Sequence, residues 1–165
     1  MNFRAYDILI SGNRLKGKEE QYMMEQLEKP IILIVDDTPE NIEILSIIFE
    51  DDYKVKAALN GEKALKIASM DKQPDLLLLD VVMPGMDGYE VCRRLKQNKN
   101  TQKIPVIFIT ANSDENDIIK AFEVGAADYI TKPVNQEVVE ARVRTHVELK
   151  LLRERMDELL ETHVR

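Results

Sequence analysis

Cysteine and long apolar runs are scarce in this chain of 165 residues, and each shortage excludes a class of protein. The single cysteine, Cys92, rules out an internal disulfide and is typical of a reducing compartment. No apolar run approaches the roughly 18 to 20 residues that a membrane-spanning helix needs. The first residues have neither the apolar core nor the cleavage site of a signal peptide. We therefore expect a cytoplasmic protein that makes no membrane contact.

An excess of positive charge is also missing. The chain has 30 acidic and 23 basic residues, for a net charge of -7, which argues against a surface built to bind nucleic acid directly. Its length suits one domain with extensions. The pattern predicts a leader at 1–29, either solvated or partly helical, a domain at 30–148 and a C-terminal helical extension at 149–165.

Apolar patterns along the domain alternate between those of strands and those of helices. We predict strands at 31–35, 53–59, 75–80, 104–110 and 126–131, and helices that begin near Thr38, Asn60, Gly88, Asp114 and Asn135. Strict alternation implies a parallel sheet with helices on both faces and right-handed crossovers. The fold class is therefore α/β, a flavodoxin-like doubly wound five-stranded parallel sheet of order 2-1-3-4-5, with an extended C-terminal helix. Such folds bind ligands beyond the carboxyl ends of the first and third strands.

Polar residues follow the strands at this edge. Asp36 and Asp37 follow the first strand, Asp80 ends the third, Thr110 ends the fourth and Lys132 follows the fifth. Crowded carboxylates repel one another and require a cation, and an all-oxygen ligand set suits Mg²⁺, or Mn²⁺ in its place. A hydroxyl and an ammonium group nearby would help to neutralise a phosphoryl group on a carboxylate. The pattern predicts a magnesium-dependent phosphoryl-transfer site with an aspartate nucleophile.

Four motifs together resemble the receiver domain of bacterial two-component response regulators. They are "VDD" at 35–37, "LLLDVVMPGMDGYE" at 77–90, "PVIFITA" at 105–111 and "GAADYITKP" at 125–133. The resemblance covers roughly residues 30 to 150, and each motif alone would be weak. It implies that Asp80 is the phosphoacceptor.

The resemblance also implies roles for the residues around Asp80. Asp37 matches the direct Mg²⁺ ligand, and Asp36 matches the neighbouring acid that acts on the metal through water. The main-chain carbonyl of Val82 matches the third protein ligand. Thr110 matches the switch hydroxyl, and Lys132 matches the lysine that pairs with the phosphoryl group.

The same resemblance implies a signalling switch. Tyr129 matches an aromatic residue whose rotamer follows the threonine, and the Lys132–Pro133 bond is expected to be cis. A histidine kinase or phosphotransfer protein is the implied phosphoryl donor, and the protein would catalyse only its own phosphorylation and dephosphorylation rather than act as a conventional enzyme. Phosphorylation would change contacts on the face formed by 114–125, 126–131 and the last helix, with a homodimer as one outcome.

Two shorter stretches resemble a narrower group of receivers. The segments "DDTPENIEIL" and "ARVRTHVELKLLRERMDELL" are similar to receivers attached to cyclic-di-GMP enzymes, and hybrid kinases share part of these sequences. The sequence itself has no signature of those outputs. An output domain in a longer native chain is therefore one expectation, and a stand-alone receiver is the other.

Two other classes of function fit the same fold. A flavodoxin-like FMN protein would need phosphate donors after the first strand, where this sequence has the acidic "DDTPEN". A Mg²⁺-dependent phosphatase with Asp80 as nucleophile would need a general acid two residues later, where Val82 stands. Neither the FMN protein nor the phosphatase accounts for as many of these residues as the signalling switch does.

The last helix has two interpretations. Leucine and methionine recur at intervals of three and four in a coiled-coil pattern, which consists of Leu149, Leu152, Met156 and Leu159. The alternative is a helix that packs back on its own domain. His146 and His163 are expected to be solvated, because the sequence places no cysteine or acid cluster beside them.

Overall fold

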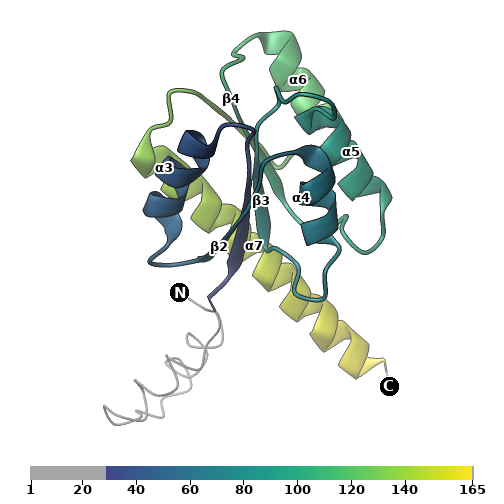
Figure 1. The fold of residues 1–165 in the computed structure, drawn as a ribbon. Helices are drawn as coiled ribbons and strands as arrows, with labels where there is room; N and C mark the ends of the chain where they lie inside the picture. The colour runs from purple at the N-terminus through teal and green to yellow at the C-terminus, as the bar shows by residue number, and fades with distance from the viewer. Residues whose placement is uncertain (1–28, 165) are drawn as a thin grey trace, which may run out of the picture.

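Five parallel strands form one sheet in the order β2-β1-β3-β4-β5, as predicted (Figure 1). The structure is a computed structural model and describes residues 29–164, so the leader predicted at 1–29 lies almost wholly outside the described residues. The strands are β1 (Ile31–Val35), β2 (Lys54–Ala58), β3 (Leu76–Leu79), β4 (Val106–Thr110) and β5 (Asp128–Thr131). Each lies within one or two residues of its predicted bounds.

Helices cover both faces of the sheet, which confirms the doubly wound architecture. They are α3 (Pro39–Phe49), α4 (Gly61–Ala68), α5 (Gly88–Gln97), α6 (Glu115–Glu123) and α7 (Gln136–His163). Residues of α3 and α7 share one hydrophobic cluster, whereas residues of α4, α5 and α6 share the cluster on the opposite face.

The central strands are continuous apolar runs because both of their faces are buried. All residues of β1 and β3 are buried, whereas β2, at the edge, is mostly exposed or intermediate. Along β1, Ile32 and Ile34 point into one cluster and Leu33 into the other. Val35 lies opposite Leu79 of β3, so the two central strands end at the same level.

Local signals set the helix boundaries. α3 begins at Pro39, whose fixed φ suits the first turn of a helix. Asp87 caps α5 by accepting a hydrogen bond from the N–H of Glu90 at 2.9 Å. Gly125, with φ of 103°, ends α6 in the left-handed conformation that glycine tolerates.

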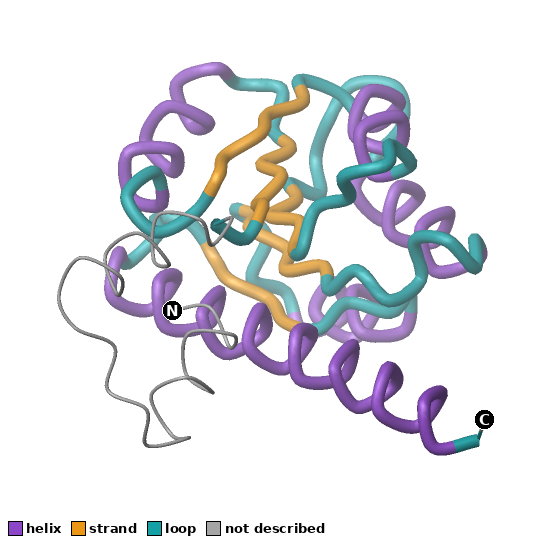
Figure 2. The backbone as a smooth tube through the Cα atoms, turned by 90° about the horizontal axis from the view of Figure 1, so that it is seen from below, coloured by secondary structure: helices purple, strands orange, loops and turns teal. Residues whose placement is uncertain are grey.

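α7 is one continuous helix of 28 residues that runs along the sheet and then past it (Figure 2). Val139, Val143 and Val147 are buried against the sheet. Beyond them the helix continues without a break, so its backbone does not change at the predicted boundary between residues 148 and 149. None of the helices within residues 29–164 has both the length and the apolar character that crossing a membrane requires.

Candidate functional site

Three carboxylates gather where β1 and β3 end. Asp36 and Asp37 follow β1, and Asp80 follows β3, which pairs with β1 in the sheet. One carboxylate oxygen of each lies within 4.8 Å of the others. Asp36 and Asp80 are buried, at 3% and 8% exposure, whereas Asp37 is exposed. The fold therefore brings together the acids that the sequence singles out.

Asp36 is held by the structure around it. Its carboxylate accepts hydrogen bonds from the N–H of Thr38 at 2.9 Å and from the side-chain amide of Asn41 at 3.1 Å. It also accepts one from Lys132 Nζ at 3.2 Å. Asp36 thus ties the start of α3 to the site, while Asp37 faces solvent. This contrast suits Asp37 better as a ligand and Asp36 as a positioning group.

Asp80 lies between a lysine and the chain that follows it. Lys132 Nζ donates to Asp80 Oδ2 at 3.2 Å, and the N–H of Val82 donates to Oδ1 at 3.3 Å. Burial raises the pKa of Asp80, Lys132 opposes that rise and Asp36 adds to it. Burial works to lower the pKa of Lys132, but its hydrogen bonds and attraction to both acids leave that pKa raised. One lysine is thus shared by two buried acids.

The turn after Asp80 is closed by a glycine. A Cβ atom at Gly88 would lie 2.3 Å from the carbonyl oxygen of Asp80, so only glycine fits there. The N–H of Gly88 donates to the carbonyl of Val81 at 2.8 Å. The turn after Asp80 is therefore fixed against the main chain of the acid itself.

Thr110 and Lys132 are joined through the main chain. The N–H of Lys132 donates to the carbonyl of Thr110 at 2.8 Å, at the carboxyl ends of β4 and β5. Thr110 is fully buried, and its hydroxyl accepts a hydrogen bond from the N–H of Asn112 at 3.3 Å. The hydroxyl therefore lies at the start of the loop that leads into α6.

Tyr129 packs inward in this structure. Its side chain is 7% exposed, and its hydroxyl donates to the carbonyl of Asn112. Burial raises the pKa of Tyr129. Asn112 is thus bound by both side chains: its N–H donates to the Thr110 hydroxyl, and its C=O accepts from the Tyr129 hydroxyl. The Lys132–Pro133 bond is cis, as the resemblance implies.

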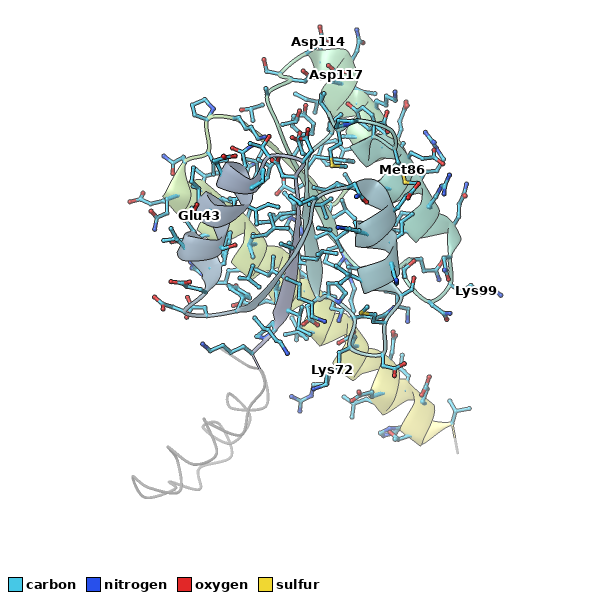
Figure 3. The ribbon with its side chains drawn as sticks, in the orientation of Figure 1. Glu43, Lys72, Met86, Lys99, Asp114 and Asp117 are labelled. Carbon is cyan, nitrogen blue, oxygen red and sulfur yellow. The ribbon has the colours of Figure 1, made fainter. Side chains whose placement is uncertain are left out.

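Sequence reasoning missed Tyr89, the second residue of α5. Its ring centroid lies 5.5 Å from that of Phe108, and Lys120 Nζ lies 4.4 Å from the ring centroid. Its hydroxyl donates to the carbonyl of Asp117 at 3.2 Å, and burial raises its pKa to about 12. Tyr89 therefore links the start of α5 to α6. Figure 3 shows Asp117 and Asp114 at this end of the molecule.

The expectation that His146 is solvated is wrong. Its side chain is 18% exposed, and Nε2 lies 3.0 Å from Asp128 Oδ2. The acid lies 18 residues earlier, at the start of β5, and α7 packs beside that strand, so sequence proximity could not reveal it. His163 is exposed, as expected.

The charge balance of the site fits a hard cation. Within the part of the chain that the structure describes, Asp36, Asp37 and Asp80 face one ammonium group, that of Lys132, so negative charge is in excess. Carboxylate oxygens with one exposed member suit Mg²⁺, which binds through a few carboxylates and retains water. The residues present therefore fit the metal that the sequence predicts.

Known proteins match both the sequence and the fold. The sequence profile of the response regulator receiver domain matches residues 32–144. A probable cyclic di-GMP phosphodiesterase from Vibrio cholerae is 44% identical over 145 residues, which are 86% of this chain and 32% of the relative. The response regulator PleD from Caulobacter vibrioides is 44% identical over 129 residues, 78% of this chain and 28% of PleD.

A solved structure agrees. The receiver domain of a signal transduction histidine kinase from Syntrophus aciditrophicus is 40% identical, with a TM-score of 0.67, and the match covers 72% of this chain and 90% of that domain. This chain spans about a third of the length of the first curated relatives it matches. Receiver domains are regulatory phosphoacceptors that bind Mg²⁺ at an acidic pocket and are phosphorylated by histidine kinases. The chain belongs to the receiver domain family of two-component response regulators.

Proposed function

We propose that Asp80 accepts a phosphoryl group and that this charge switches the contacts of the domain. The observation that supports it most directly is the position of Asp80, buried at the strand edge and 3.2 Å from Lys132 within a cluster of three acids. A carboxylate oxygen of Asp80 would attack phosphorus, the bond from phosphorus to the donor's leaving group would break, and an acyl phosphate would form. The leaving group departs with the electron pair of that bond.

We assign the metal to the exposed side of the acid cluster. Asp37 and Asp80 would hold Mg²⁺ with the main-chain carbonyl of Val82, and Asp36 would position it through water. When bound, Mg²⁺ supplies positive charge that neutralises the carboxylates and the phosphoryl oxygens. Mn²⁺ would substitute because it favours the same oxygen ligands.

Lys132 and Thr110 would act on the product. Lys132 already lies between Asp36 and Asp80, so it can pair with a phosphoryl oxygen by a small movement. Thr110 would turn its hydroxyl from Asn112 toward the phosphoryl group. Tyr129 would stabilise that change, because its hydroxyl contacts the carbonyl of the same Asn112.

The partners follow from this chemistry. The donor would be a histidine kinase or a phosphotransfer protein, and the chain would catalyse only its own phosphorylation and dephosphorylation. The response would pass to the face made of α6, β5 and α7, where a homodimer or an output domain of a longer chain would bind. Residues 30–148 are the proposed receiver and 149–165 the extension. A cytoplasmic location stays a prediction from the sequence.

Labelling with acetyl phosphate tests the assignment. In the presence of Mg²⁺, one phosphoryl group should be added, and hydroxylamine should remove it, as expected for an acyl phosphate. Asp80→Asn should abolish the label, whereas Asp51→Asn, the same change at an exposed turn, should leave it intact. Labelling of Asp80→Asn at the wild-type rate would show that another residue is the acceptor.

A further inference from the structure

The outer face of α7 beyond Val147 is exposed in the described residues 29–164, and only its first residue, Leu149, also lines the cavity between α7 and the domain. Four of its apolar side chains follow a spacing of three and four, namely Leu149, Leu152, Met156 and Leu159, exposed at 41%, 40%, 61% and 52%, and Leu160 beside them is 62% exposed. A helix turns by about 100° per residue, so these four lie roughly opposite Val143 and Val147, which pack on the sheet. One face of the helix, with the valines, packs back on the domain. The other face carries the coiled-coil pattern, so each of the two predicted interpretations describes one face.

Two ion pairs fix the rotation of the helix about its axis. Lys150 Nζ donates to Asp75 Oδ1 at 2.7 Å, at the amino end of β3. Further along, Lys103 Nζ donates to Asp157 Oδ2 at 2.8 Å. Both contacts lie on the side of α7 that faces the domain. They hold the apolar face outward, where a second molecule can reach it.

We infer that this face is the seam of a parallel, two-stranded coiled coil with a second copy of the chain. The seam is made of Leu149, Leu152, Met156 and Leu159. Spacing of three and four places Leu149 and Met156 at a positions and Leu152 and Leu159 at d positions. Leucine at d is the residue that parallel dimers favour. This inference does not depend on phosphorylation of Asp80, so either can fail alone.

The flanking charges distinguish a parallel from an antiparallel pair. In a parallel pair, Glu148 at g faces Arg153 at e of the second copy. The two-fold symmetry of the dimer gives two such attractive pairs. In an antiparallel pair with full overlap of the seam, Arg153 faces its own counterpart, and so does Arg155. Like charges would then meet at two levels. The sequence around the seam therefore favours the parallel arrangement.

Upstream residues limit the seam to the end of the helix. Arg142, one heptad before Leu149, is held by the carbonyl of Tyr129 at 2.7 Å and by Asp128. Thr145, at the preceding d position, is polar and exposed. The seam thus begins where the helix leaves the sheet, and two heptads predict a weak, concentration-dependent dimer rather than a permanent one.

Cysteine cross-linking of the full chain tests both the surface and its direction. In a parallel, in-register dimer, Met156 meets Met156, so Met156→Cys should form a disulfide-linked dimer under mild oxidation. Native Cys92 will not compete, because it is fully buried and burial raises the pKa of its thiol to about 11. Glu158→Cys, on the same helix but off the seam, is the matched control. Equal cross-linking at the two positions would overturn the inference.

Sedimentation over a concentration series gives an independent measurement. Leu152→Glu should weaken association at least tenfold, whereas Ile47→Glu, at an apolar and even more exposed position on α3, should not. Glu148→Arg and Arg153→Glu should each weaken it about two- to fivefold, and the double variant should restore it. Loss of association in Ile47→Glu but not in Leu152→Glu would place the dimer on another surface.

Discussion

One strand has an aspartate–lysine pair at each end, and the two pairs are built differently. At the amino end of β3, Asp75 pairs with Lys150 at 2.7 Å. At the carboxyl end, Asp80 pairs with Lys132 at 3.2 Å. Asp75 also accepts from the N–H of Ile31 at 2.7 Å, so its two oxygens each have a donor. Each lysine also pairs with a second acid, but Glu154 beside Lys150 is 45% exposed, whereas Asp36 beside Lys132 is buried.

The difference separates a structural pair from the pair that we propose to be reactive. At the Asp75 site the second acid of Lys150 is half-exposed, so only one carboxylate is buried there, and the site ties α7 to the starts of β1 and β3. At the Asp80 site, burial and then the charge of Asp36 raise the pKa of Asp80 against the effect of Lys132, and the excess of negative charge favours a cation. We expect the acids at this end to bind that cation at some cost in stability. Figure 3 shows the two ends: Lys72 lies at the end near Asp75, and Asp114 at the other.

The largest effect is expected at the structural pair. Asp75→Ala should lower the free energy of unfolding by about 3 kcal/mol, because it leaves a mostly buried Lys150 and the N–H of Ile31 without this acceptor. Urea unfolding would measure it. Asp75→Asn keeps an acceptor for Ile31 and should lose less. A loss below about 1 kcal/mol for Asp75→Ala would mean that the pair is no stronger than a surface ion pair.

Magnesium should stabilise the protein by an amount that depends on the acids at the other end. At ten times its dissociation constant, Mg²⁺ should raise the free energy of unfolding by about 1.4 kcal/mol. Asp37→Ala should weaken binding more than Asp36→Ala, because Asp37 is the proposed direct ligand. Thermal unfolding across a Mg²⁺ series measures both, with Asp75→Asn as the control that keeps the response. A full response in both acid variants would remove the cluster from metal binding.

Neutralising Asp80 should change the free energy of unfolding in the opposite direction from neutralising Asp75. Without metal, Asp80→Asn should raise the free energy of unfolding by on the order of 1 kcal/mol, because it relieves burial of a charge and repulsion from Asp36. The same denaturation experiment with a chelator present would measure it. Destabilisation by Asp80→Asn would show that the bond to Lys132 outweighs both costs.

A smaller effect follows from pH. The folded pKa of Asp80 is raised above its ordinary value of 3.8, so the folded state binds its proton more tightly than the unfolded state does. The corresponding stability is fully present below the unfolded pKa and is lost as pH rises through the folded pKa. The advantage of Asp80→Asn over wild type should therefore shrink as pH falls from neutral toward 4. A constant difference over that range would contradict the raised pKa.

Most of the fold could be predicted from the sequence, because buried strands and strand-end acids are local patterns. The run of four leucines in β3, the cap Asp87 and the stop at Gly125 each act within a few residues. The site followed from topology, since parallel strands end at a common edge. What the sequence could not reveal were contacts between distant segments.

Those missed contacts share a cause. The pair of His146 with Asp128, and the contact of the Tyr89 hydroxyl with Asp117, join residues 18 and 28 positions apart on different elements. Neither leaves a periodic signal, because each depends on how two packed elements face one another. The outward direction of the α7 seam was ambiguous for the same reason until the buried valines fixed the opposite face.

The unbroken helix α7 also has a mechanical consequence. From Val147 to His163 the helix extends about 24 Å past its last buried valine. Since no hinge interrupts it, a tilt of about 5° at the sheet would displace the far end by about 2 Å. α7 would thus behave as a rigid lever whose pivot lies on the domain, and a small repacking near β5 would be magnified at its tip.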